Sequence, residues 1–484
     1  MMTAAVTVRL DEPLGRINPN VYGHFAEHLG RCIDEGTWVG ENSTIPNDLG
    51  IRTDVVEALK VLSPPVLRWP GGCFADAYDW RDGIGPRDQR PRRINVWWNR
   101  EEDNQFGTDE FIRFCRGIGA EPYICGNVGS GNPREMMQWL EYCNYEGTTT
   151  LAQERAANGH PAPYKVKYWG IGNENWGCGG HYDADHYARE YRRFASYLRR
   201  IDPDIQLISC GFNAEWDLAF FNALKRIDLV DQHSIHHYYK CGPGTGFSEE
   251  QYYGLFPAAL AMEGQIRRLA QLLGHFERGR QVGIAVDEWG VWHPEADVGL
   301  YQPNTLRDAL AAALVFDVFH RNAEYVTMAN IAQLINVLQC LIQTDGAAMW
   351  LTPTYHVYDL YRPHMGNIAV RTDVEVDRHE FSVDNQRHSV ALVSASASRS
   401  NGSGGVVLSV TNLSLDKTAA VTVDLHAGEA TSGTMRLLTA TQPDAVNSAE
   451  KPDTVRVVDG GAVQCAGEVT LELPPMSVAT VTLI

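Results

Sequence analysis

Two glutamates follow apolar runs at positions where a barrel would place its chemistry. Glu174 lies near the end of KYWGIGNEN (167–175), and Glu288 lies near the end of QVGIAVDEWG (281–290). If both runs are strands of one closed barrel, the two carboxyl groups lie at its rim. Converging carboxyl groups hydrolyse glycosidic bonds: one protonates the leaving oxygen, while the other stays ionised as nucleophile or base. A separation of ~5 Å would mean retention of configuration, and ~6.5 to 9.5 Å would mean inversion.

Other polar and aromatic residues gather at the ends of similar runs. Tryptophans on or just after these ends offer flat faces for sugar rings, and Trp292 falls in a loop. Because side chains alternate along a strand, we expect Asp287 to point away from Glu288 and to act as a structural acceptor. The polar candidates at strand ends are Glu27, Arg68, Asn173, His236, Tyr238 and Gln333.

A zinc peptidase is the alternative of a different class. His24, Glu27 and His28 spell HxxEH, in which two histidines one helical turn apart hold the metal. The surrounding NPNVYGHFAEHLG (18–30) carries Asn, Pro and Gly at short intervals and predicts a strand and loop rather than the required helix. The glycine-rich segments match neither nucleotide-binding motif. We therefore expect no metal and no cofactor.

The chain between residues 17 and 363 has the rhythm of βα units. Apolar strand-like runs alternate with charged segments of helical period, such as 183–201 and 305–322. Eight strands would close a (β/α)8 TIM barrel with its chemistry at the carboxyl ends. The candidate strands are 21–27, 65–72, 121–129, 167–175, 206–212, 230–239, 281–290 and 325–334.

The composition changes after this region. All tryptophans and tyrosines precede residue 362, and short alternating runs separated by Gly, Ser, Asn, Asp and Pro follow it. This pattern predicts an α/β protein with a C-terminal antiparallel β-sandwich of jelly-roll type at 364–484, to which residues 1–16 add a strand. The serine-rich segment 394–405 is interpreted as a mobile hairpin loop.

Charge and cysteine usage limit the partners and the compartment. With 41 basic and 60 acidic side chains, the formal charge of −19 disfavours nucleic acid and anionic membranes. The chain shows no signal-peptide pattern, so we expect a cytoplasmic protein. Its 10 cysteines form no CxxC pair and are interpreted as free thiols.

Five long motifs resemble the α-L-arabinofuranosidases of glycoside hydrolase family 51. The resemblance implies a retaining enzyme of a (β/α)8 barrel, with Glu174 as acid/base and Glu288 as nucleophile. The motifs are RWPGGCFADAYDWRDGIGPRDQRP (68–91), YWGIGNENWGCGG (168–180), SIHHYY (234–239), DEWGVW (287–292) and NIAQLINV (330–337).

The resemblance also implies the substrate and its contacts. It implies an exo-acting enzyme (EC 3.2.1.55) that releases terminal non-reducing α-L-arabinofuranose from arabinan or arabinoxylan oligosaccharides, without a cofactor; β-xylosidase and endo-β-glucanase activities are the alternatives within the family. Many members are homo-oligomers, often hexamers. Cys73 replaces a frequent asparagine at a sugar contact and is a weaker donor. The implied sugar contacts are Glu27, Arg68, Cys73, Asn173, His236, Tyr238, Trp292 and Gln333.

Overall fold

The computed structural model describes residues 1–276, 281–296, 298–400, 404–465 and 469–484. In this part of the chain, eight parallel strands form a closed barrel in chain order, each inside one of the expected runs or extending it by one residue. This confirms the predicted TIM barrel. The strands are β2 (Gly23–Phe25), β5 (Val66–Trp69), β8 (Glu121–Gly126), β9 (Tyr168–Ile171), β10 (Gln206–Ser209), β11 (Gln232–Tyr239), β12 (Gly283–Val291) and β13 (Val326–Ala332).

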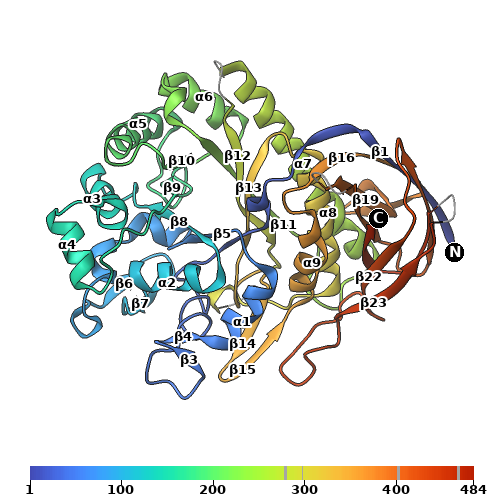
Figure 1. Cartoon of the computed structure of the whole chain (residues 1–484), viewed down its shortest axis with the longest axis horizontal. Coiled ribbons are helices and arrows are strands. Elements are labelled where there is room, and N and C mark those ends of the chain that lie inside the picture. Colours follow the sequence, from blue (N-terminus) through green and yellow to red (C-terminus); the bar gives the residue numbers. More distant parts are fainter. Residues whose placement is uncertain (277–280, 297, 401–403, 466–468) are drawn as a thin grey trace.

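Helices connect these strands around the outside of the barrel (Figure 1). Helix α5 illustrates the cause: the Asp183 side chain caps its first turn, and Tyr187, Tyr191, Phe194 and Leu198 repeat at helical spacing on its buried face. The helices are α1 (Thr53–Leu62), α2 (Thr108–Ile118), α3 (Pro133–Asn144), α4 (Thr150–Ala157), α5 (Ala184–Ile201), α6 (Ala214–Leu224), α7 (Glu249–Phe276), α8 (Leu306–Arg321) and α9 (Pro353–Tyr361).

A second sheet of nine strands is built mainly from the C-terminal part of the chain. The first strand, β1, pairs antiparallel with β16 and parallel with β21, and its blue ribbon lies among the red strands in Figure 1. Strand β24 at one edge also contacts β23 and β25, so the sheet folds over itself into a sandwich. Its order is β23 (Val457–Val463), β22 (Gly433–Thr439), β25 (Ser477–Leu483), β20 (Val406–Asn412), β19 (Val393–Arg399), β16 (Ile368–Val376), β1 (Met2–Arg16), β21 (Ala419–His426) and β24 (Val469–Leu473).

Two-stranded hairpins are inserted in both the barrel region and the sandwich region of the chain. Of these, β6 (Arg93–Asn95) with β7 (Arg100–Glu102) follows β5, and β3 (Asn47–Asp48) with β4 (Ile51–Arg52) follows β2. The others are β14 (Ile342–Asp345) with β15 (Ala348–Leu351) and β17 (Arg378–Val383) with β18 (Gln386–Ala391).

The interpretation of the serine-rich segment as a loop is wrong for most of its described part. Its serines 394, 396 and 398 belong to strand β19 and face helix α8 and the segment that follows α9. Ser394 and Ser396 donate to the buried carboxylate of Asp317 at 2.6 and 2.7 Å. Ser396 and Ser398 are buried and Ser394 is half-buried, and all three make hydrogen bonds at the junction of the two parts. Residues 401–403 lie outside the described residues.

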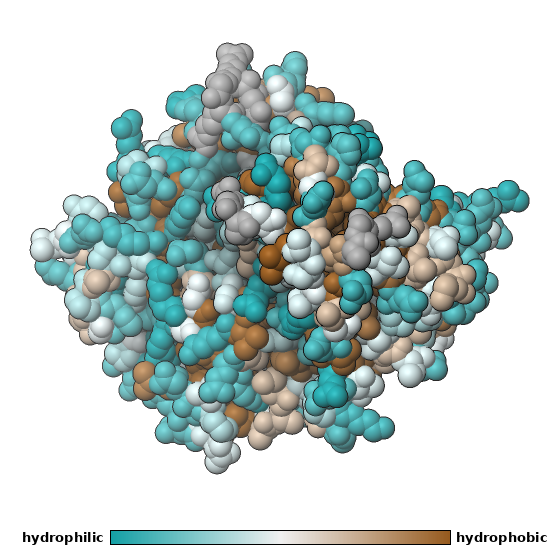
Figure 2. Space-filling view, turned by 45° about the vertical axis from the view of Figure 1, so that its right-hand side comes forward, coloured by the Kyte–Doolittle hydropathy of each residue, from teal (hydrophilic) through white to brown (hydrophobic). Residues whose placement is uncertain are grey.

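The surface is mainly hydrophilic on the face that Figure 2 shows, with hydrophobic residues scattered in small groups. Among the helices of the described ranges, none has the length and apolar character needed to cross a bilayer.

Candidate active site

Glu174 and Glu288 meet at the carboxyl ends of β9 and β12. A carboxylate oxygen of each, together with a ring nitrogen of His236, lies within 4.8 Å of the others. Glu174 adopts a left-handed backbone conformation (φ 42°). Its carbonyl oxygen accepts from the N–H groups of Gly177 and Gly179 at 2.6 and 3.1 Å, which hold the tight turn. The nearest carboxylate oxygens of Glu174 and Glu288 are thus no more than 4.8 Å apart, which agrees with the ~5 Å expected for retention better than with the ~6.5 to 9.5 Å of inverting pairs.

Glu288 is enclosed by donors. Its Oε1 accepts from Arg68 Nη1 at 2.8 Å, and its Oε2 accepts from the Tyr238 hydroxyl at 2.7 Å. Burial opposes its charge, but His236, Arg68 and Tyr238 outweigh that cost and lower the pKa of Glu288. The side chain, only 7% exposed, is thus kept ionised and fixed in orientation.

Glu174 is more open to solvent than Glu288. Its side chain is 21% exposed, and its Oε1 lies 2.9 Å from Nδ1 of His236. The same nitrogen lies 3.6 Å from Oε2 of Glu288, so the imidazole bridges the two carboxylates. Burial opposes charge on His236, but Glu288 and Glu174 outweigh it and raise its pKa. His237 faces the other way, with its Nε2 2.9 Å from the carbonyl oxygen of Ala258.

Arg68 joins the two glutamate segments. Its second amino group donates to Oδ1 of Asn173 at 2.6 Å, and the guanidinium lies 4.6 Å from the centre of the Phe25 ring. The backbone N–H of Asn173 donates to Asp76 at 2.6 Å. With its oxygen engaged, Asn173 presents its NH2 group as the donor available to a ligand.

Glu27 is buried and lies close enough to Glu288 to feel its charge. Its Oε1 accepts from the Phe74 N–H and from Trp98 Nε1, both at 3.1 Å, and its Oε2 accepts from Gln333 Nε2 at 3.2 Å. Burial first, and the charge of Glu288 second, raise the pKa of Glu27 to about 7. Glu27 is thus able to exchange a proton near neutral pH.

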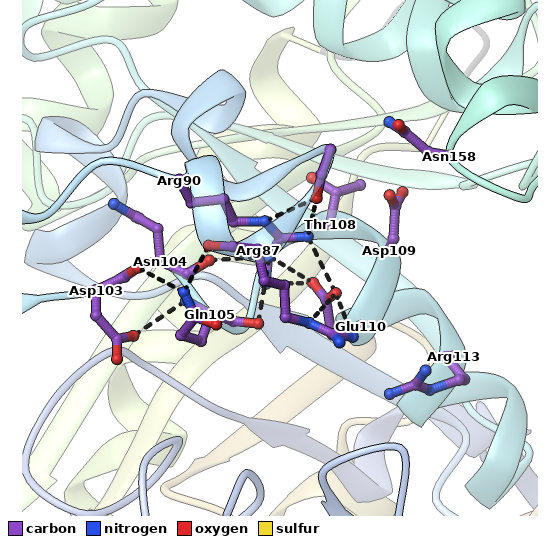
Figure 3. Close-up of polar contacts among 12 residues, drawn as sticks. Arg87, Arg90, Asp103, Asn104, Gln105, Thr108, Asp109, Glu110, Arg113 and Asn158 are labelled. Atoms are coloured by element: carbon purple, nitrogen blue, oxygen red, sulfur yellow. Dashed lines mark hydrogen bonds and ion pairs between the residues drawn. The ribbon is translucent and has the colours of Figure 1, made fainter. Parts of the chain in front are cut away.

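Trp98, which contacts Glu27, belongs to the segment 84–107. A buried ion pair lies where the two ends of this segment meet (Figure 3). Arg90 Nη1 lies 3.0 Å from Oε2 of Glu110 in the first turn of α2. The same amino group donates to the carbonyl oxygen of Asn104 at 2.9 Å. Both ends of the segment therefore meet at one guanidinium, which fixes the position of the indole between them.

The tryptophans on or just after the strand ends differ in their exposure to solvent. Trp292 is 37% exposed and packs edge-on against Tyr238, with ring centres 5.2 Å apart. Trp97 is 39% exposed, next to Trp98. Trp69 and Trp289 are completely buried and serve packing.

An aromatic pair follows the strands β9 and β10. The rings of Trp176 and Phe212 stack with their centres 4.0 Å apart and an interplanar angle of 16°. Phe212 is 46% exposed, and Trp176 lies two residues after Glu174. The pair therefore offers an apolar platform at the turn that carries Glu174.

The prediction of free thiols is wrong for two cysteines. Cys73 and Cys178 form a disulfide across 105 residues, because the turns after β5 and β9 bring their Cα atoms to 5.5 Å. Cys73 is therefore no thiol donor to a sugar in this structure. Cys178 Sγ lies 3.7 Å from Oε2 of Glu174, a contact without a hydrogen bond because a disulfide sulfur carries no proton. The free cysteines of the described ranges are 32, 115, 125, 143, 210, 241, 340 and 465.

The prediction that Asp287 points away from Glu288 is also wrong. Strand β12 carries an extra residue relative to β11 between the pairs Ile235 with Val286 and His236 with Glu288, so the alternation is interrupted. Asp287 then lies 3.9 Å from Arg68 Nε. As expected for an acceptor, it receives bonds from Tyr123 and Asn330 at 2.7 and 3.1 Å.

The HxxEH residues do not form the helical zinc site. His24 lies in strand β2, where its ring packs 4.9 Å from that of Tyr358, and His28 Nδ1 lies 3.1 Å from Glu102. His28 therefore contacts Glu102 and not Glu27, the glutamate of the HxxEH motif. This arrangement does not fit a metallopeptidase.

Asp76 is a positioning residue that the sequence argument missed. It accepts from the N–H groups of Val128, Gly129 and Asn173, each at 2.6 Å, and so ties together the turns after β5, β8 and β9. Burial raises the pKa of Asp76 to about 7 against these hydrogen bonds. Its place inside the motif RWPGGCFADAYDW was the available signal.

Comparison with known proteins identifies the family. Residues 58–252 match the profile of the alpha-L-arabinofuranosidase 1 domain, and residues 287–477 match that of the alpha-L-arabinofuranosidase C-terminal domain. An intracellular exo-alpha-L-arabinofuranosidase of Bacteroides ovatus is 40% identical over 99% of this chain and 96% of its own length. The chain belongs to the α-L-arabinofuranosidase family.

Solved structures of the family superpose over the whole chain. The GH51 arabinofuranosidase of Xanthomonas axonopodis pv. citri has a TM-score of 0.95 and 37% identity, with full coverage of both chains. An arabinose complex of the α-L-arabinofuranosidase of Thermotoga maritima has a TM-score of 0.91 and 35% identity, again with full coverage. The two glutamates fall within the two matched profiles, one in each.

Proposed function

We propose that this chain is a retaining exo-α-L-arabinofuranosidase that acts on arabinan and arabinoxylan oligosaccharides. The observation that carries the proposal is the convergence of Glu174 and Glu288 within 4.8 Å, in a chain of this family. Glu288, held ionised by Arg68 and Tyr238, attacks the anomeric carbon, while Glu174 protonates the leaving oxygen. Glu174 then deprotonates the water that releases arabinose from the glycosyl-enzyme.

The surrounding residues position the sugar in this proposal. Asn173 offers its NH2 group near the reacting carbon, where contacts strengthen as the oxocarbenium-like transition state forms. Glu27, Gln333 and Trp292 bind the remaining face and hydroxyls, and His236 shields the two carboxylates from mutual repulsion. Because Cys73 is bonded to Cys178, it has no thiol group to donate to the sugar.

The simplest test compares nitrophenyl glycosides. We expect rapid hydrolysis of the α-L-arabinofuranoside, and rates lower by on the order of 10²-fold or more for the β-xylopyranoside and β-glucopyranoside, since the wrong ring leaves buried polar groups unpaired. Faster hydrolysis of the xyloside or the glucoside would favour the β-xylosidase or endo-β-glucanase alternative. Insensitivity of the arabinofuranosidase rate to a chelator would argue further against the zinc peptidase.

Removal of the Tyr238 hydroxyl is expected to shift the pH profile. The pKa of Glu288 is lowered, so activity is present above that pKa and is lost as the pH falls through it. In Tyr238→Phe, one cause of the lowering disappears, and the acidic limb of kcat/KM moves to higher pH. Tyr197→Phe, on an exposed face of α5, is the matched control. An unmoved or downward-shifted limb in Tyr238→Phe would contradict the assigned role.

The Trp176–Phe212 platform is expected to bind the leaving-group sugars. In Phe212→Ala we expect kcat/KM for arabinoxylo-oligosaccharides to fall about tenfold, the equivalent of ~1.4 kcal/mol of lost apolar and stacking contact. Hydrolysis of methyl α-L-arabinofuranoside, which carries no second sugar, is expected to stay unchanged. Leu218→Ala, equally exposed on α6, is the control. Equal losses on both substrates would contradict this role.

Three organisational features also belong to the proposal. A cytoplasmic location is supported by the word "intracellular" in the name of the Bacteroides ovatus relative. A homo-oligomer, a hexamer by family resemblance, can be measured by light scattering. The division into a catalytic part (17–363) and a sandwich (364–484 with 1–16) is supported by the strand pairing of β1 and can be probed by limited proteolysis.

A further inference from the structure

We propose that the reduced form of the Cys73–Cys178 pair, together with Glu174, is a binding site for a soft divalent cation such as Zn²⁺. One ligand atom from each of the three residues lies within 4.8 Å of the others. Tetrahedral zinc with bonds of ~2.0 to 2.3 Å places its ligand atoms about 3.3 to 3.8 Å apart, so a small adjustment of this group would close around the ion. Zinc favours thiolates, and a carboxylate completes three protein ligands with a fourth position open to water.

The site exists only after reduction. Disulfide sulfurs carry no negative charge and are poor ligands, whereas a thiol pair loses its protons to the metal. A small-molecule dithiol or a phosphine supplies the two electrons that cleave the S–S bond, and is itself oxidised. Zn²⁺ then displaces one proton from each of Cys73 and Cys178. The carboxylate of Glu174 becomes the third ligand.

The two turns stay together without the disulfide. Asp76, three residues after Cys73, accepts from the backbone N–H of Asn173 at 2.6 Å and from the side chain of Asn175 at 3.4 Å. Asn175 in turn donates to the carbonyl oxygen of Gly179 at 2.7 Å, next to Cys178. These contacts span the same two segments as the covalent bond, so the thiols remain neighbours after reduction.

The position of the site has a chemical consequence. Both cysteines are partly exposed, so a reductant and an ion can reach them. A carboxylate bound to zinc has no proton to deliver to a leaving group. Zinc bound at this site is therefore expected to inhibit hydrolysis. This inhibition rests on the proposed role of Glu174 as the acid, whereas metal binding by the thiol pair does not.

Cobalt binding tests the site independently of activity. The full chain, reduced with a phosphine that is then removed under anaerobic conditions, is titrated with Co²⁺. We expect one equivalent to produce a near-ultraviolet thiolate-to-cobalt charge-transfer band, and excess Zn²⁺ to abolish it. The oxidised chain should give no band. A reduced chain with no more absorbance than the oxidised one would overturn the proposal, and so would a band that persists in Cys73→Ser.

Inhibition is measured as the ratio of rates with and without Zn²⁺ at one redox state. A slight excess of ZnCl₂ is expected to lower hydrolysis of the nitrophenyl arabinofuranoside by the reduced enzyme at least about tenfold, reversibly with a chelator. The oxidised enzyme is expected to be unaffected, and MgCl₂ is expected to have no effect because Mg²⁺ prefers oxygen ligands. Cys465→Ser is the matched control and should keep the zinc response. Equal zinc inhibition of both redox states would overturn the inhibitory role.

Discussion

Glu288→Ala is expected to lower kcat by on the order of 10⁴-fold or more, because the covalent intermediate has no attachment point. The substitution also leaves Arg68 and Tyr238 without the carboxylate they contact at 2.8 and 2.7 Å. The small side chain opens space on the nucleophile face, where azide can attack an activated arabinofuranoside. The product is expected to be the arabinofuranosyl azide of inverted configuration.

Two results separate this role from a structural one. Circular dichroism should show the same fold for Glu288→Ala and for Glu57→Ala, a control on the exposed side of α1 that should retain full activity. A retained-configuration azide, or an activity within tenfold of the parent, would contradict assignment of the nucleophile to Glu288.

Glu174→Ala is expected to separate substrates by the quality of their leaving group. General acid catalysis contributes about 10² to 10⁴-fold, so oligosaccharide hydrolysis should fall by that factor. A dinitrophenyl leaving group needs no proton, and its release from the substrate should be nearly unchanged. The second step should then become limiting, because the water has lost its base. A burst of dinitrophenol followed by slow turnover is the expected trace.

The control for this experiment is the neighbouring aromatic residue. Trp176→Ala shortens a side chain on the same turn without removing the carboxyl group, and it should show no burst. An equal loss on both classes of substrate in Glu174→Ala would contradict the acid role.

The barrel could be predicted because its signals are local. The strands are short, largely apolar runs, several of which carry polar residues near their ends, as in the runs that end near Glu174 and Glu288. Eight such runs alternate with segments of helical period. In a closed barrel of eight strands, the runs 167–175 and 281–290 are strands four and seven. The fold therefore brings Glu174 and Glu288 to the same rim of the barrel. The β-sandwich was predictable for the same reason, from alternation between turn residues.

The corrections concern partners that are distant in sequence. The Cys73–Cys178 bond depends on which two turns are adjacent in the folded barrel, and no spacing rule indicates a pair 105 residues apart. The sequence of strand β19 resembles a loop because its serines are polar, but two of them, Ser394 and Ser396, donate to Asp317 in helix α8. The extra residue in β12, beside which Asp287 and Glu288 both approach Arg68, is likewise a matter of register between two strands.

Trapping the glycosyl-enzyme would show which side chain forms the covalent bond to arabinose. The Glu174→Ala chain is mixed with dinitrophenyl α-L-arabinofuranoside, quenched in acid during the slow phase, and analysed by intact mass and peptide mapping. We expect a single added pentosyl residue, carried by the peptide that contains Glu288. A burst without any adduct, or an adduct on Glu27 or another residue, would contradict the proposed double displacement.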